Sequence, residues 1–497
     1  MTAIFDGEHI IRTGSADYVA GLAACKRRDF ATGVESLRRA DSQGDPEAPY
    51  VLGLLYSAGK GVDQSSEEAA RLYRRGAEAG SIGAMHALAK YLFHGVGVAQ
   101  DQGEAARWFE RAAEQGHVVA CHAIGTMHLK GLGVPRDPSK AMRWLKLAGE
   151  QGNAEAQHTL AGLYSTGDVF PTDLKACVYW LKRAAVQRHP QSQCALAMLH
   201  SFGLGVSKDL KEALRLYKDA ASQGYVEAQF IVGQSFATGQ GATRSGQKAA
   251  QWFKLAAGQG HLKAQFFLAG MYREGEGLEQ DAAAALHWYR RAALKGFAEA
   301  QHCLGVMHAK GEGAPQDFGE AARWFQQAAL QGLSEAQFNL AELYRSGKAV
   351  IRDEKEALRL YQEAARDGFP QAHFRLGLVY SEGGNVEPDF VKAYMSFELA
   401  DHYGFPESVR YRDLLATHLT PEQIATARRM AREWIDSARS REQSRPKPPS
   451  LEEFLNAAGP QGPVANPSDP LTPSGSIDRS GSIDPSGSID PSGPKDP

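Results

Sequence analysis

A glycine that recurs every 36 residues is the feature that most constrains how this chain can fold. The series runs Gly44, Gly80, Gly116, Gly152, Gly224, Gly260, Gly296, Gly332, Gly368 and Gly404, and Arg188 takes the one place where the glycine is missing. No residue is inserted between copies, so ten units of 36 residues fill residues 45–404. A fixed period of this length predicts an array of stacked helical units rather than one globular core.

Each unit begins with the pattern of an amphipathic helix when its residues are numbered from the one after the closing glycine. Position 4 is nearly always alanine and position 8 is apolar, as in Ala84, Ala120, Ala156, Ala228 and Ala300, and in Leu160, Leu196, Leu268 and Leu304. Position 9 is glycine or alanine throughout. Positions 4, 8, 9 and 12 share one side of a helix, so we expect them to form the packing stripe of a first helix.

Two glycines at positions 15 and 17 end that helix, for example Gly95 and Gly97, or Gly311 and Gly313. The first of them suits the left-handed conformation that closes a helix. A phosphate-binding loop is not favoured, because no strand precedes this G-x-G pattern and it recurs in most units. The pattern therefore predicts a turn between two helices.

Position 21 marks the start of a second helix. It holds aspartate in most units, namely Asp101, Asp137, Asp173, Asp209, Asp281, Asp317, Asp353 and Asp389, and Glu104, Glu212, Glu320 and Glu356 follow three residues later in four of them. We expect each aspartate to cap its helix and each glutamate to reach back to the cap, a capping box that stabilises a helix by roughly 1 kcal/mol.

A tryptophan occupies position 28 in six units, at Trp108, Trp144, Trp180, Trp252, Trp288 and Trp324. An aromatic residue or leucine follows it, and paired alanines close the helix at positions 32 and 33 in most units. Large side chains one turn before alanines suit the stacking of one unit on the next. We therefore interpret these tryptophans as core residues rather than as a cofactor site.

The pattern is nearly intact in Ala298–Gly332 and resembles the Sel1-like repeat, a relative of the tetratricopeptide repeat, of bacterial type. The resemblance covers residues 45–404 and implies an all-α fold, a right-handed solenoid of stacked antiparallel helix pairs. It further implies that the first helices line a concave surface, and that the protein acts as an adaptor or scaffold without enzymatic activity.

The sequence outside the repeats predicts four further segments. Residues 1–14 form an N-terminal segment, residues 15–44 an end-capping helix pair, and residues 405–439 capping helices with a last helix from Thr420 to about Ala438. Residues 440–497, rich in proline, glycine and serine and ending in SGSIDP repeats, are expected to be disordered. Within them, residues 450–458 carry a capping box and the apolar Leu451, Phe454 and Leu455, so this stretch could fold on a partner, fold on the array's own groove, or only fluctuate.

Positions 3, 7, 10 and 14 of the first helix vary between units, although they share one face. Positions that vary are not needed for stacking, so this face is predicted to bind a protein or peptide ligand. The candidate residues are Lys90, His94, Lys130, Gln234, Glu274, Lys310, Glu342, Arg375 and Glu382. Position 6 holds a second series that changes from histidine to phenylalanine along the array; we interpret it as packing between units, with an aromatic ligand track as the alternative.

Composition narrows the functional classes. The net charge of -3 matches the five basic and eight acidic residues from Ser440 onward, so the array is close to neutral, and no nucleic-acid partner is expected. The sequence shows no membrane-spanning stretch and no leader, and its five cysteines fall at different positions of the unit, so reduced thiols and a cytoplasmic location are expected.

No cofactor and no metal site is expected, because neither a C-x-x-C nor an H-E-x-x-H motif occurs. One alternative is a hydrolase of the kind labelled β-lactamase in this family, because Ser245–Lys248 matches S-x-x-K; Ser245 also fits the helix-capping place of its unit. Another is an envelope or exopolysaccharide assembly factor. The partner and the oligomeric state stay open.

Overall fold

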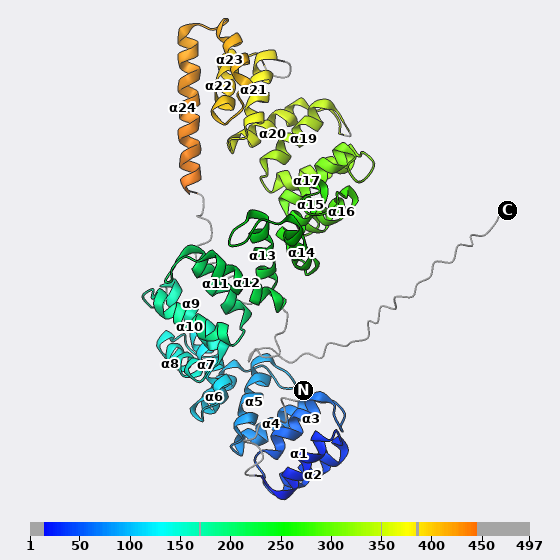
Figure 1. The fold of residues 1–497 in the computed structure, drawn as a ribbon, viewed down its shortest axis with the longest axis vertical. Coiled ribbons are helices and arrows are strands. Elements are labelled where there is room, and N and C mark those ends of the chain that lie inside the picture. Colours follow the sequence, from blue (N-terminus) through cyan, green and yellow to red (C-terminus); the bar gives the residue numbers. More distant parts are fainter. Residues whose placement is uncertain (1–13, 168–169, 349, 384–386, 445–497) are drawn as a thin grey trace, which may run out of the picture. The chain divides into compact units, whose positions relative to one another are not determined.

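The computed structural model describes residues 14–167, 170–348, 350–383 and 387–444, with side chains up to Arg441. These residues form 24 α-helices and, within the described ranges, no strand (Figure 1). The predicted all-α fold of helix pairs is confirmed. The predicted N-terminal segment apart from Gly14, and residues 445–497 of the predicted tail, lie outside the described residues.

The chain divides into two compact units, which we describe separately. The first contains the described residues up to Ala184, and the second runs from Ala185 to the end of the described chain. The first unit holds α1 (Ala16–Lys26), α2 (Phe30–Ser42), α3 (Ala48–Ala58), α4 (Ser66–Glu78), α5 (Ile82–His94), α6 (Gln102–Glu114), α7 (Val118–Lys130), α8 (Pro138–Glu150), α9 (Ala154–Thr166) and α10 (Leu174–Val186), whose last two residues pass the boundary.

The second unit continues with the same alternation of first and second helices. Its repeats hold α11 (Pro190–Phe202), α12 (Leu210–Ser222), α13 (Val226–Thr238), α14 (Gly246–Gly258), α15 (Leu262–Glu274), α16 (Ala282–Ala293), α17 (Ala298–Lys310), α18 (Phe318–Leu330), α19 (Ser334–Ser346), α20 (Glu354–Arg366), α21 (Pro370–Glu382) and α22 (Phe390–His402). After them come α23 (Ser408–Ala416) and the long α24 (Pro421–Ser444).

The two glycines of the G-x-G turn have different structural roles. Gly95 ends α5 with φ of 70°, the left-handed conformation that the sequence predicts. Gly97 lies so close to the preceding repeat that an added Cβ would stand 2.2 Å from the carbonyl oxygen of Ser66. The second glycine is therefore required by packing between repeats. Arg188, in place of a closing glycine, adopts the same left-handed conformation with φ of 63°.

The aspartate at position 21 caps the second helix as predicted, since the Asp101 side chain accepts the backbone N–H of Glu104 at 2.8 Å. The predicted return bond from the glutamate is wrong. The backbone N–H of Asp101 instead donates to the carbonyl of Leu92, which ties the second helix to the first. The carboxylate of Glu104 is left to accept bonds from Arg74 and Trp108.

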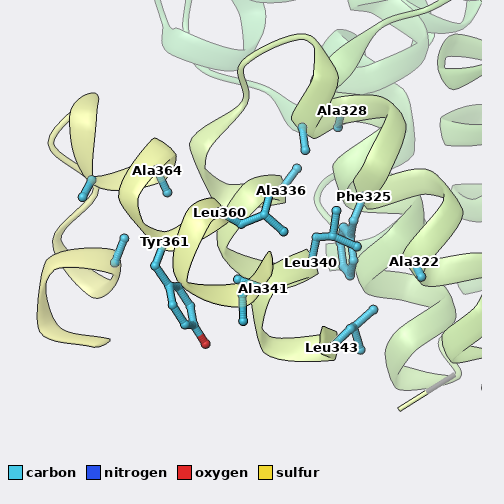
Figure 2. Packing of buried hydrophobic residues seen from close by; sticks show 14 of the residues in the cluster. Ala322, Phe325, Ala328, Ala336, Leu340, Ala341, Leu343, Leu360, Tyr361 and Ala364 are labelled. Atoms are coloured by element: carbon cyan, nitrogen blue, oxygen red, sulfur yellow. The ribbon is translucent and has the colours of Figure 1, made fainter. Parts of the chain in front are cut away.

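The core follows the predicted stripe. Position 4 alanines such as Ala84 and Ala300 are fully buried. The tryptophans are buried in α6, α8 and α10, as expected for core residues, but only half-buried in α14, α16 and α18, where the aromatic residue at position 29 fills the core. Figure 2 shows one such core, in which Phe325, Leu340 and Leu360 meet between α18, α19 and α20.

The last helix is longer than the sequence predicts. It starts with the expected capping box, because Thr420 N–H donates to the Gln423 side chain and Gln423 N–H donates to the Thr420 hydroxyl. Its buried side carries Ala427 and Ala431 and packs on α22. The helix then continues to Ser444, so the first five residues of the predicted tail, 440–444, are helical.

Candidate functional site

A glutamine at position 5 of the first helix ties six of the repeats to the one before. Its Nε2 donates to the carbonyl at position 33 of the preceding repeat, at 2.8 to 3.4 Å. The series comprises Gln157, Gln193, Gln229, Gln265, Gln301 and Gln337, all buried. Carbonyls in the last turn of a helix lack an intrahelical partner, so each glutamine satisfies a group that would otherwise be exposed or orphaned.

A second glutamine completes this bond where position 35 also holds one. Gln223, Gln259 and Gln331 donate to the Oε1 of Gln193, Gln229 and Gln301, each at 2.8 Å. Sequence analysis did not predict this ladder, although the glutamine occurs in six of the ten repeats. It could have been found from its place next to the position 4 alanine of the packing stripe.

The position 6 series is packing between repeats, as the sequence analysis favoured. Phe266 of α15 contacts the ring of Tyr289 in its own repeat at 5.6 Å and that of Phe297 in the next repeat at 5.5 Å. In the first unit His86 lies in the same way between Phe109 and His117, at 5.7 and 4.6 Å. These rings join repeats, and their faces are occupied by protein.

The predicted binding residues lie on the first helices, outside the stacking positions, but differ in exposure. Four are exposed: Lys130, Glu274, Lys310 and Glu382. Five are half-buried: Lys90, His94, Gln234, Glu342 and Arg375. Lys310 lies 3.6 Å from Glu312, and Glu274 lies 3.3 Å from Arg273. The exposed four are therefore the members with most of their side chain available to a ligand.

Glu342 is the centre of an ionic network on α19. Its Oε1 accepts the Tyr361 hydroxyl at 2.6 Å and lies 2.8 Å from Nε of Arg375, while Arg345 lies 2.8 Å from Oε2. Burial, followed by the Glu342 carboxylate, raises the pKa of Tyr361, so the hydroxyl stays protonated and donates. Because Arg375 belongs to the next repeat, the first-helix face is continuous across this junction.

Two aromatic side chains on the same face were missed by sequence reasoning. Phe267 at position 7 of α15 is 41% exposed, and Phe202 at position 14 of α11 is 68% exposed. Phe267 is held by stacking on Phe253 at 5.7 Å. They could have been found from the sequence, because no other repeat carries an aromatic residue at position 7 or, except for His94, an aromatic ring at position 14.

Ser245 is a helix cap. Its hydroxyl accepts the backbone N–H of Lys248 at 3.3 Å, and the Lys248 ammonium lies over the ring of Phe236, 5.5 Å from its centroid. The hydrolase alternative needs the lysine amine to act on the serine hydroxyl. The S-x-x-K match here is instead a capped helix start.

A cavity of about 1230 Å³ lies in the second unit, beside the last part of α24. It is bordered by side chains of α18, α19, α20, α22 and α24, and by the turns after α18, α20 and α22. Its lining includes Leu330, Gln337, Arg366, Ile435 and Arg439. We call it the terminal cavity; sequence analysis did not foresee it, because α24 is about one hundred residues from α18 along the chain.

The five cysteines are free, and four of them are buried. Burial raises the pKa of Cys177 to about 12, so this thiol stays protonated and unreactive. Within the described ranges, no three His, Cys, Asp or Glu side chains are grouped so that they could hold a metal ion. No helix there has the length and apolar character needed to cross a bilayer.

Comparison with known families and structures agrees with this geometry. The model of the Sel1 repeat matches ten consecutive segments, residues 46–81, 82–117, 118–153, 154–189, 190–225, 226–261, 262–297, 298–333, 334–369 and 370–400. The matches follow the helix pairs from α3 to α22 without a gap. No curated protein matches the chain.

Two solved structures are similar in fold and sequence. One is a protective antigen of uropathogenic Escherichia coli that displays an SLR fold; it is 30% identical, with a TM-score of 0.74, over 90% of this chain and 98% of the other. The second is a Sel1 repeat protein from Oxalobacter formigenes, 34% identical with a TM-score of 0.51, over 62% of this chain and 90% of the other.

Proposed function

Because the chain belongs to the Sel1 repeat family, whose members typically mediate protein–protein interactions, we propose that it is a non-enzymatic scaffold. It binds a protein or peptide along the first-helix face of its repeats and so assembles a complex. The observation that carries the proposal is the separation of tasks on the first helix. Positions 4, 8 and 9 are buried in every repeat, whereas position 14 carries the exposed side chains of Lys130, Glu274, Lys310 and Glu382.

The chemistry of that face suits an extended protein ligand. In the second unit it offers the exposed rings of Phe202 and Phe267, and the charged side chains of Glu274 and Lys310. Aromatic anchors beside charges of both signs are typical of protein interfaces, where rings supply most of the affinity and charges set the orientation of the partner. A cytoplasmic location stays a prediction.

A charge-reversal experiment tests the face. The full chain carrying Glu274→Lys and Lys310→Glu is compared with the unchanged chain in affinity capture from the native lysate, followed by mass spectrometry. The control reverses Lys254 and Glu279, which are exposed in the same part of the array but lie in α14 and in the turn before α16. Both variants keep the net charge, so any difference reports on the place of the charges.

We expect a protein that the unchanged chain and the control retain and the face variant loses, by about tenfold or more if the two charges contact the partner. Equal recovery by all three chains would place the interface elsewhere. No recovery by the unchanged chain would contradict the binding function, and no observation on the described residues favours the hydrolase or the envelope alternative over it.

A further inference from the structure

The terminal cavity is larger than the sites that hold small molecules. Small-molecule pockets measure about 300 to 1,000 Å³, whereas this cavity measures about 1230 Å³ and is open on one side. It is bordered by α24, which packs on α22, and by the ends of α18 and α20, where Arg441 donates to the carbonyl of Arg366 at 3.4 Å. The volume of the cavity is large enough for a short segment of polypeptide.

The lining of the cavity combines apolar side chains with a basic rim. Leu330 at the end of α18 is 83% exposed, and Ile435 and Ala438 on α24 are half-buried. Around them stand four exposed arginines, among them Arg366, Arg439 and Arg441, against the three carboxylates of Glu356, Glu363 and Asp367. The fourth arginine of the lining, Arg359, is paired with two neighbouring glutamates, Glu356 and Glu363. The rim therefore favours an acidic, amphipathic occupant.

One polar atom in the cavity lacks the partner that the equivalent atoms of Gln193, Gln229 and Gln301 have, as does that of Gln265 outside the cavity. Gln337 is 7% exposed, and its Oε1 has no hydrogen-bond donor among the described residues. In the ladder this atom accepts a bond from a glutamine at position 35, but that position here holds Asp367, whose carboxylate cannot donate. A buried acceptor without a donor is destabilising, so the junction at Gln337 lacks a contribution that the junctions at Gln193, Gln229 and Gln301 have.

We propose that the terminal cavity binds the chain's own segment Ser450–Asn456. In the sequence, Leu451, Phe454 and Leu455 are spaced to share one helical face, and Glu452 and Glu453 supply the acidic charge that the rim favours. The apolar face meets Leu330, Ile435 and Ala438, and the glutamates meet the arginines.

The position of the tether supports this occupant over a separate peptide. The described chain ends at Ser444, the last residue of α24, and residues up to Arg441 of that helix line the cavity. Six residue steps lead from Ser444 to Ser450, and an extended chain covers about 20 Å in that length. A segment held on so short a linker has an effective concentration in the millimolar range, which exceeds that of most free ligands.

Hydrogen exchange on the full chain tests the proposal, with mass spectrometry reading the amides of residues 451–456. Their exchange is compared with that of a synthetic peptide of residues 448–460. The cavity variant is Leu330→Glu, which places a carboxylate at an exposed position of the lining. Its matched control is Leu294→Glu, because Leu294 occupies position 34 in an earlier repeat, is 70% exposed and lies outside the cavity.

We expect amides 451–456 to exchange about tenfold or more slowly in the full chain than in the peptide, as docking at millimolar effective concentration implies. Leu330→Glu and Phe454→Asp return them to the peptide rate, while Leu294→Glu and Ile477→Asp leave them slow. Exchange at the peptide rate in the unchanged chain overturns the proposal, and so does protection that survives Leu330→Glu. Protection that grows with protein concentration assigns the cavity to a second copy instead.

Discussion

The two units close the same junction between repeats with different chemistry. In the first unit the residue before each of the helices α5, α7 and α9 caps the helix through its side chain: Ser81, His117 and Asn153. In the second unit His189 and His261 cap in the same way, but Tyr225, Phe297, Leu333 and Phe369 make no such bond. The rings of Phe297 and Phe369 instead pack on Phe266 and Phe338, at 5.5 and 5.4 Å.

The difference shows that the start of the first helix can be stabilised either by a side-chain cap or by an aromatic contact, so no single residue type is required there. A side-chain cap contributes about 1 kcal/mol, and an aromatic pair contributes about 0.5 to 1.5 kcal/mol beyond the area that it buries. His117 and His261 do both, since each caps its helix and stacks on the ring at position 6 of the previous repeat. The sequence can therefore drift here while the 36-residue period is kept.

The largest effect on stability is expected when the ring at position 6 is removed. Phe266→Ala should lower the free energy of unfolding by about 3 kcal/mol, because a phenylalanine between two other rings leaves a cavity. His86→Ala at the equivalent place in the first unit should cost about 1 kcal/mol, since its buried Nε2 lacks a partner and is lost without penalty. Chemical denaturation of both variants measures the difference; equal losses would break the comparison.

The next largest loss of stability is expected when a glutamine of the ladder is replaced. Gln301→Met should cost about 2 kcal/mol, because it leaves the Ala293 carbonyl and the Gln331 amide unpaired. Gln337→Met should cost about half as much, since Gln337 makes one of these bonds, at 3.4 Å, and lacks the other. Local stability read by hydrogen exchange in α17 and α19 separates the two, and identical costs would argue against a role for the second glutamine.

The pH dependence of stability should distinguish His86 from the phenylalanines at position 6 in the second unit. Burial, with smaller effects of His117 and Lys90, lowers the pKa of His86 to about 3. Between pH 6.5 and pH 3, His86 is therefore protonated in the unfolded chain but neutral in the folded chain. The stability that His86 contributes above pH 6.5 is lost as the pH falls toward 3. At pH 5 the loss is about 2 kcal/mol relative to pH 7.5.

His86→Phe should remove this part of the pH dependence, which denaturation at pH 7.5 and pH 5 measures. Protection of amides in α5 to α7 separates this region from His302 and His373 of the second unit, whose pKa values are also lowered. Burial also lowers the pKa of His117, which stacks on His86, so His86→Phe should remove only part of the local pH dependence. An unchanged pH dependence in α5 to α7 would mean that another group titrates there.

The smallest effect concerns the caps alone. Asn153→Ala should cost about 1 kcal/mol by removing the bond from the Ala156 backbone N–H, which is 2.7 Å long. Asn153→Ser keeps a capping oxygen and should be close to neutral. Thermal unfolding of the two variants side by side provides the measurement, and a loss in the serine variant as large as in the alanine variant would show that the cap bond is not what matters.

Much of the fold follows from local chemistry and was predictable. Gly95 and Asp101 mark where helices end and begin through bonds to residues a few places away, and these bounds were found from spacing alone. The capping box failed because the N–H of Asp101 is taken by Leu92 of the preceding helix, a contact that depends on how the pair closes. The terminal cavity could not be predicted, since Ile435 and Leu330 meet only through the path of α24. The binding residues on the first helices stay predictions.

The glutamine ladder also fixes how such a chain can change its length. Every bond of the series joins residues 8 or 30 apart, whichever repeat it belongs to. Copying or deleting 36 residues therefore keeps each position 5 glutamine in register with the backbone carbonyl at position 33 of the preceding repeat, whereas a single inserted residue misaligns the glutamine and the second glycine of its repeat. Duplication or loss of whole repeats therefore changes the length of the array without shifting the register between neighbouring repeats.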